Sequence, residues 1–82
     1  MWRLVVPRSV LRSLERISTR DRQRLAAAIE AMTENPFGGD FRKLAGNECR
    51  LRVGSYRILY EIDREQRIVE IHEVVRRTST TY

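Results

Sequence analysis

The chain has 82 residues, of which 41% are hydrophobic and 33% charged, with a formal net charge of +5. This size excludes a second domain or a large cofactor, and the composition excludes a disordered chain, so we expect one domain over residues 1–82. The only cysteine, Cys49, excludes an internal disulfide and, with no His/Cys cluster of zinc-site spacing, indicates a reducing cytoplasm and no bound metal.

The first half of the chain predicts a strand followed by two helices. Residues 2–6 are apolar and β-branched and stop at Pro7, which is typical of a strand and too short for a membrane span. Residues 8–17 and 18–34 carry apolar residues at helical spacing, with Ser18 as a cap for the second helix. The two segments therefore predict a helical hairpin with one apolar side.

The second half predicts three strands. Residues 49–53 alternate between apolar and basic, Gly54 and Ser55 form a tight turn, and residues 56–62 and 67–75 are rich in β-branched and aromatic residues. The order β-α-α-β-β-β predicts an α+β fold, in which the helical hairpin covers one face of an antiparallel sheet. The other face should stay open.

Three arginines are predicted to share the open face. Alternation puts Arg50 and Arg52 opposite the apolar residues of their strand, and Arg57 follows on the next strand. Each one alone is also explained as a solvated residue of a half-exposed strand, and Arg57 as the partner of Glu61 or Glu70. Residues 1–46 carry nine basic and five acidic side chains, and residues 47–82 carry seven and six. An anion site in the second half must therefore depend on placement rather than on total charge.

The same alternation divides the last predicted strand. It places Val75 on the covered face and Val74 on the open face together with His72. Arg76 and Tyr82 would extend the open surface beyond the end of that strand.

The element order and two sequence motifs resemble the RelE/ParE superfamily of type II toxins. The motifs are the segment GSYRILYEI at 54–62, approached by KLAG at 43–46, and an ending of two arginines, four residues and Tyr82. The likeness covers essentially the whole chain and implies the RelE-like microbial RNase fold. The superfamily contains ribosome-dependent mRNA endonucleases of the RelE type and gyrase poisons of the ParE type.

The RelE type implies a metal-independent endoribonuclease, or mRNA interferase, that inhibits translation without a cofactor. In this reaction the 2′-hydroxyl of one nucleotide attacks the adjacent phosphate, which gives a 2′,3′-cyclic phosphate and a free 5′-hydroxyl. The residues that match the catalytic positions of the RelE type are Arg50, Arg52, Arg57, Arg76 and Tyr82. Arg57 and Arg76 would stabilise phosphate charge, and Tyr82 would stack on a nucleobase.

One departure from the RelE pattern concerns proton transfer. RelE enzymes often carry lysines where this chain has arginines, and arginine is a poor proton donor or acceptor. The base must then be Tyr82, His72 or Glu61, which we rank in that order.

Several partners follow from this resemblance. A cognate antitoxin, acidic and amphipathic, would fold onto the toxin, and operator DNA would be contacted only through that complex. Docking on the ribosome and mRNA would use basic residues of the helical region, namely Arg8, Arg12, Arg16, Arg20, Arg22 and Arg24. The alternatives are a ParE-type gyrase inhibitor and an inactive homologue that acts as a corepressor with its antitoxin.

Overall fold

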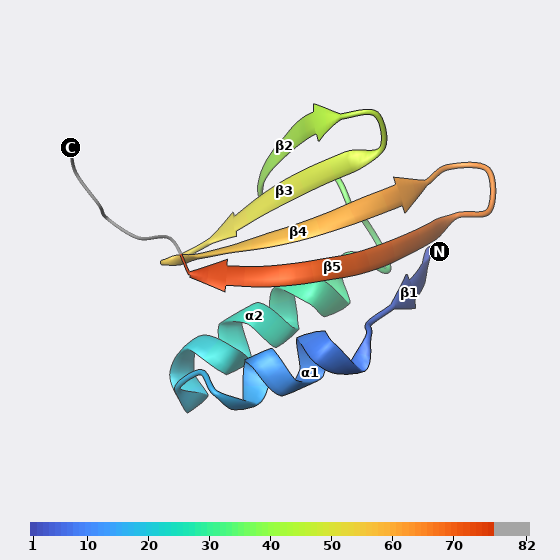
Figure 1. Ribbon diagram of the computed structural model, residues 1–82. Helices are drawn as coiled ribbons and strands as arrows, with labels where there is room; N and C mark the ends of the chain where they lie inside the picture. Colours follow the sequence, from blue (N-terminus) through green and yellow to red (C-terminus); the bar gives the residue numbers. More distant parts are fainter. Residues whose placement is uncertain (77–82) are drawn as a thin grey trace.

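The computed structural model describes residues 1–76, which form two helices and one five-stranded sheet (Figure 1). The elements in chain order are β1 Arg3–Val5, α1 Arg8–Glu15, α2 Thr19–Ala31, β2 Asp40–Ala45, β3 Glu48–Val53, β4 Tyr56–Asp63 and β5 Ile68–Arg76. The strands lie in the order β1-β5-β4-β3-β2. The predicted α+β class is confirmed. Neither described helix has the length and apolar character needed to cross a membrane.

Two features of the sheet differ from the prediction. Strand β2 was not predicted, because this edge strand is exposed along almost its whole length and shows no alternation of burial. Strand β1 runs parallel to β5, with Arg3 opposite Ile68, whereas an antiparallel sheet was expected. The sheet is therefore mixed, with one parallel pair at one edge and an antiparallel meander across the rest.

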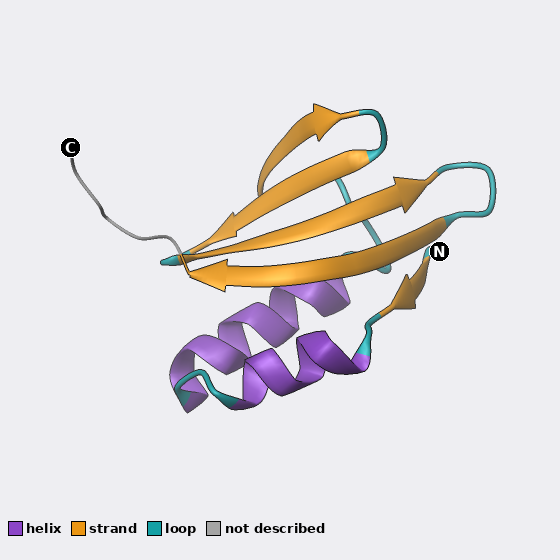
Figure 2. Cartoon of the chain, viewed as in Figure 1, coloured by secondary structure: helices purple, strands orange, loops and turns teal. Residues whose placement is uncertain are grey.

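Both helices lie on the same face of the sheet (Figure 2). The Ser18 hydroxyl accepts a hydrogen bond from the backbone N–H of Asp21 at 3.4 Å, as expected of a cap. Helix α1 packs against β5 and α2 against β3. Helix α2 ends at Ala31, and Pro36 lies within the segment that leads to β2. The other face of the sheet has no helix over it.

The core lies between the helices and the covered face of the sheet. Its fully buried side chains include Leu25 of α2, Ile58 and Tyr60 of β4, and Ile71 of β5. The Tyr60 hydroxyl donates a hydrogen bond of 2.8 Å to the carbonyl of Pro36, which satisfies its polar end inside the core. Burial raises the pKa of Tyr60, so this phenol stays protonated and contributes to structure rather than to proton transfer.

A β-bulge in β5 reverses the alternation that the sequence predicted. Leu59 of β4 lies opposite Glu73, but the next residue along β4 lies opposite Ile71, so His72 is an extra residue. Beyond the bulge, Val74 packs against the core and Val75 lies opposite Arg57. The predicted faces of Val74 and Val75 were therefore wrong, because one inserted residue exchanges the two faces of a strand.

Candidate functional site

The open face of the sheet brings four arginines together near the turn between β3 and β4. Register places Arg42 of β2 directly opposite Arg50 of β3, and Arg52 of β3 directly opposite Arg57 of β4. The turn is tight because Gly54 has φ +60°, a conformation that residues other than glycine rarely adopt. We call these four arginines the basic patch. The structure thus confirms that Arg50, Arg52 and Arg57 share a face, and it adds Arg42.

The basic patch keeps like charges together at a cost. Two arginines placed directly opposite each other on neighbouring strands repel and destabilise a sheet. Among residues 1–76, Arg52 is the only member of the patch that has an ion pair, at 3.9 Å from Asp40. Desolvation, followed by repulsion from Arg52, Arg42 and Arg57, lowers the pKa of Arg50. Arginine nevertheless stays charged in proteins, so the patch is a concentration of positive charge.

Arg50 also has an unpaired polar atom. Its Nε is buried, and within the described part of the chain it is the one buried side-chain nitrogen or oxygen that has no hydrogen-bond partner. Buried donors in folded proteins nearly always have a partner. An anion bound against the basic patch would supply an acceptor for this donor.

The other half of the open face is acidic. Glu61 of β4 lies opposite both Glu48 of β3 and Glu70 of β5, so three carboxylates form one row. His72 lies beside this row, with Nε2 at 3.4 Å from Glu61 Oε1 and Nδ1 at 3.9 Å from Glu48 Oε2. Both distances exceed the usual N–H···O hydrogen-bond range of about 2.7–3.2 Å, so the two carboxylates are close neighbours of the imidazole rather than its hydrogen-bond partners. His72 is the inserted residue of the β-bulge. It therefore lies between the acidic row and the row that contains Arg50.

Glu48, Glu61 and His72 also form the one group in residues 1–76 that could hold a metal ion. Their ligand atoms lie within 4.8 Å of one another, and imidazole and carboxylate are common ligands of divalent transition metals. All three side chains are partly exposed, and pairing of His72 with the carboxylates already accounts for their approach.

Two of the predicted catalytic residues are not brought onto the basic patch. Arg76 is the last residue of β5 and lies opposite Tyr56, one position beyond the Arg57 row. Alternation therefore places Arg76 on the helix side of the sheet, rather than on the open surface that the sequence predicted. Tyr82 lies outside the described residues.

The sequence prediction did not include Arg42 in the site. The signal that could have identified it is the alternation of Asp40, Arg42 and Leu44 with Phe41, a residue that packs against the core. That pattern was hidden because β2 is an edge strand with only one partly buried residue.

The arginines predicted to contact ribosomal RNA lie on or between the two helices. All are exposed except Arg22, which is half-buried and donates a hydrogen bond of 3.3 Å to the Thr19 hydroxyl. Arg24 reaches the turn between β3 and β4, where a side chain on Gly54 would come within 2.9 Å of its Nη1. The basic surface of α2 therefore continues to the edge of the basic patch.

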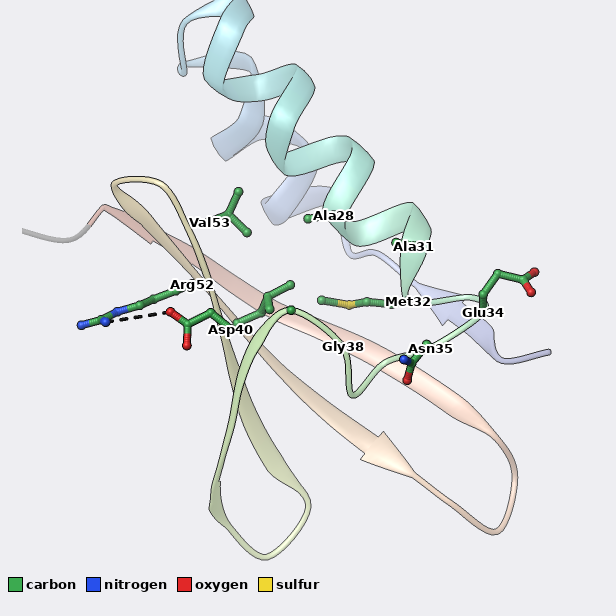
Figure 3. A pocket seen from close by; sticks show the side chains of 11 residues that line it. Ala28, Ala31, Met32, Glu34, Asn35, Gly38, Asp40, Arg52 and Val53 are labelled. Carbon is green, nitrogen blue, oxygen red and sulfur yellow. Dashed lines mark ion pairs between the residues drawn. The ribbon is translucent and has the colours of Figure 1, made fainter.

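An apolar cavity of about 460 Å³ separates α2 from β3 (Figure 3). Ala28 of α2 and Met32, the residue after that helix, line one side, and Leu51 and Val53 of β3 line the other. The ion pair between Arg52 and Asp40 lies at the rim (Figure 3). The cavity therefore lies between the helices and the covered face, and Arg52 of the basic patch stands at its rim.

Comparisons with known proteins give the family from a family model and the fold from solved structures. A family model described as the ParE toxin of the type II toxin–antitoxin system parDE matches residues 4–80. The RelE–RelB complex of Pyrococcus horikoshii superposes with a TM-score of 0.88 at 20% identity, covering 96% of this chain and 98% of that chain. The isolated RelE toxin of E. coli superposes with a TM-score of 0.79 at 14% identity, covering 98% of this chain and 88% of that chain. The RelBE2 toxin–antitoxin complex of Mycobacterium tuberculosis superposes with a TM-score of 0.71 at 23% identity, covering 93% of this chain and 98% of that chain. No curated protein sequence matches significantly.

Proposed function

Since this chain belongs to the ParE toxin family of type II toxin–antitoxin systems, we propose that it arrests growth by cutting mRNA on the ribosome. The observation that carries this proposal is the basic patch, in which four arginines face one another on three adjacent strands. Such an arrangement costs stability in the free protein and favours a polyanion. The superposition on RelE toxins supports the same choice.

In the proposed reaction the basic patch holds the scissile phosphate. The 2′-hydroxyl loses its proton and attacks the adjacent phosphorus, the bond to the 5′-oxygen breaks, and that oxygen gains a proton. Negative charge accumulates on the non-bridging oxygens, where Arg50, Arg52 and Arg57 can donate hydrogen bonds. Arg50 Nε would then gain the acceptor that it lacks. The step requires no metal ion or cofactor.

The proton acceptor in this proposal is Tyr82 or the His72–Glu61 pair. His72 is the candidate among the described residues, because it borders the Arg50 row and histidine is the side chain that most often serves as a general base. Glu61 Oε1 lies 3.4 Å from His72 Nε2, and a small movement of either side chain would form a hydrogen bond that orients the ring and leaves the other nitrogen to accept the proton. Arg76, from the end of β5, would act only if the substrate reaches past the edge of the open face.

The partners in this proposal are the ribosome, mRNA and an antitoxin in the cytoplasm. The exposed arginines of α1 and α2 would dock on ribosomal RNA by releasing its counterions. An acidic, amphipathic antitoxin segment would place apolar side chains in the cavity between Met32 and Val53, where the lining is apolar. Several of the superposed RelE toxins are described as complexes with RelB antitoxin.

The test is induction in bacterial cells followed by mapping of mRNA 5′ ends. We expect cuts within translated codons that disappear in Arg57→Ala and Tyr82→Phe and persist in Lys43→Gln. Lys43 lies on the same edge strand as Arg42 but opposite Cys49 rather than opposite an arginine. A gyrase inhibitor, the activity that the ParE name favours, would leave mRNA intact and induce a DNA-damage response. Absence of growth arrest would leave only the corepressor role.

A further inference from the structure

A second arginine site lies at the opposite end of the sheet from the basic patch. Here Arg67 stacks on the only tryptophan of the chain, with Cζ 4.8 Å from the centre of the Trp2 ring. Trp2 in turn meets Phe37 edge to face at 5.8 Å, and Arg64 lies 4.9 Å above the Phe37 ring. Strand β1 and the turn between β4 and β5 come together at this end, on the right of Figure 1.

The backbone fixes the stack of Arg67 on Trp2. Arg67 has φ +56° and is the one residue other than glycine in the described chain with a left-handed backbone. This conformation costs energy for a residue with a side chain, and glycine would adopt it freely. Its carbonyl accepts a 2.8 Å hydrogen bond from Arg3 N–H, and Trp2 N–H donates one of the same length to the Thr33 carbonyl. The guanidinium is thus kept at a position where the backbone alone would favour glycine.

Arg67 exposes the outer side of this stack to solvent, whereas Trp2 is half-buried, and within residues 1–76 no carboxylate forms an ion pair with the stack. It borders a shallow cavity of about 610 Å³, lined by Met1, Trp2, Arg3, Gln66, Arg67 and Ile68. The ion pairs found in residues 1–76 involve Arg52 and His72, so none neutralises Arg3, Arg64 or Arg67. A flat cationic surface beside an unfilled hollow therefore remains available to a ligand.

We propose that Trp2, Arg3, Gln66 and Arg67, together called the tryptophan corner, bind one nucleotide of single-stranded RNA. A nucleobase would stack on the Arg67–Trp2 pair, and its phosphate would contact Arg3, since aromatic rings and guanidinium planes are the usual platforms for unpaired bases. The choice of RNA as the ligand rests on the proposed function. Along β5, seven residue steps separate Ile68 at this corner from Val75, which lies opposite Arg57 of the basic patch, and they span about 23 Å at about 3.3 Å per residue. It would hold RNA several nucleotides from the cut.

Trp2 also provides the measurement, because it is the one tryptophan. Its fluorescence is followed while purified protein is titrated with an oligoadenylate of about ten nucleotides, without ribosomes. We expect saturable quenching. Arg67→Gly should bind about tenfold more weakly, equivalent to about 1.4 kcal/mol, because it loses both the stack and a charge. Glycine suits φ +56°, so thermal stability should be kept or raised.

The matched control is Lys43→Gln, which removes the same charge from β2 at the other edge of the sheet. We expect its affinity to stay within about twofold of the parent chain, because only long-range attraction is lost. No quenching, or equal weakening in the two variants, would overturn the proposal. Equal or stronger quenching by a glutamate decapeptide would also overturn it and would identify an acidic protein as the partner. Failure of the mRNA-cleavage test would leave the predicted quenching unchanged, so the two proposals fail separately.

Discussion

On the covered face of the sheet Ile58 and Tyr60 are fully buried, whereas on the open face Arg57 is exposed and Leu59 and Glu61 are only half-buried. On the covered face, the buried hydroxyl of Tyr60 has a partner in the carbonyl of Pro36. The open face instead keeps arginines opposite arginines and a glutamate row beside them. The covered face of these strands thus stabilises the fold. The open face of the same strands holds like charges together, an arrangement that suits a charged ligand.

The largest predicted effect concerns the difference between the covered and open faces, tested at two neighbouring residues of β4. Ile58→Ala should lower the free energy of unfolding by about 2–5 kcal/mol, because it removes fully buried atoms and leaves a cavity. Leu59→Ala, on the open face and half-buried, should cost less than about 1 kcal/mol. Urea denaturation measures both, and similar losses in the two variants would contradict the division between the faces.

A smaller effect is expected for the buried phenol. Tyr60→Phe should cost about 1–3 kcal/mol at neutral pH, because the Pro36 carbonyl loses its buried donor. Since burial raises the pKa of Tyr60 in the folded state, its contribution is intact below the unfolded pKa of about 10 and falls as pH rises above that value.

The Tyr60→Phe variant should therefore lose stability less steeply than the parent chain above about pH 10. Burial also raises the pKa of Cys49, which has the same sign, but this thiol is present in both chains and its effect cancels. Tyr56→Phe is the control, because Tyr56 is only half-buried. If the free energy of unfolding fell equally steeply with pH in the parent chain and in Tyr60→Phe, the Tyr60 phenol would not be the cause of the alkaline loss of stability.

Much of this fold followed from the sequence because the buried faces are regular. Helical spacing located both helices, the Ser18 cap was correct, and alternation placed Arg50, Arg52 and Arg57 on one face. Strand β2 was missed because an edge strand needs no buried stripe to be stable, and its pairing with β3 supplies the order instead.

The remaining errors came from the ends and from one inserted residue. Alternation with a period of two does not reveal a bulge. Because His72 is inserted, Val74 and Val75 lie on the faces opposite to those predicted. The same shift sets Arg76 on the helix side, although its motif suggested the open surface. The tryptophan corner was invisible in sequence, because Trp2 and Arg67 meet only through the parallel pairing of β1 with β5.

The smallest predicted effect concerns the repulsion that the open face tolerates. Arg42→Gln should raise the free energy of unfolding by about 0.2–1 kcal/mol at low salt, because Arg42 lies directly opposite Arg50. The gain should shrink in high salt, where exposed charges are screened. Lys43→Gln removes a charge from the same strand but faces Cys49, so it should show no gain. Denaturation at two salt concentrations measures the difference. A loss of stability in Arg42→Gln would mean that these arginines are not held together against repulsion, and it would remove the main physical reason to assign a polyanion to this face.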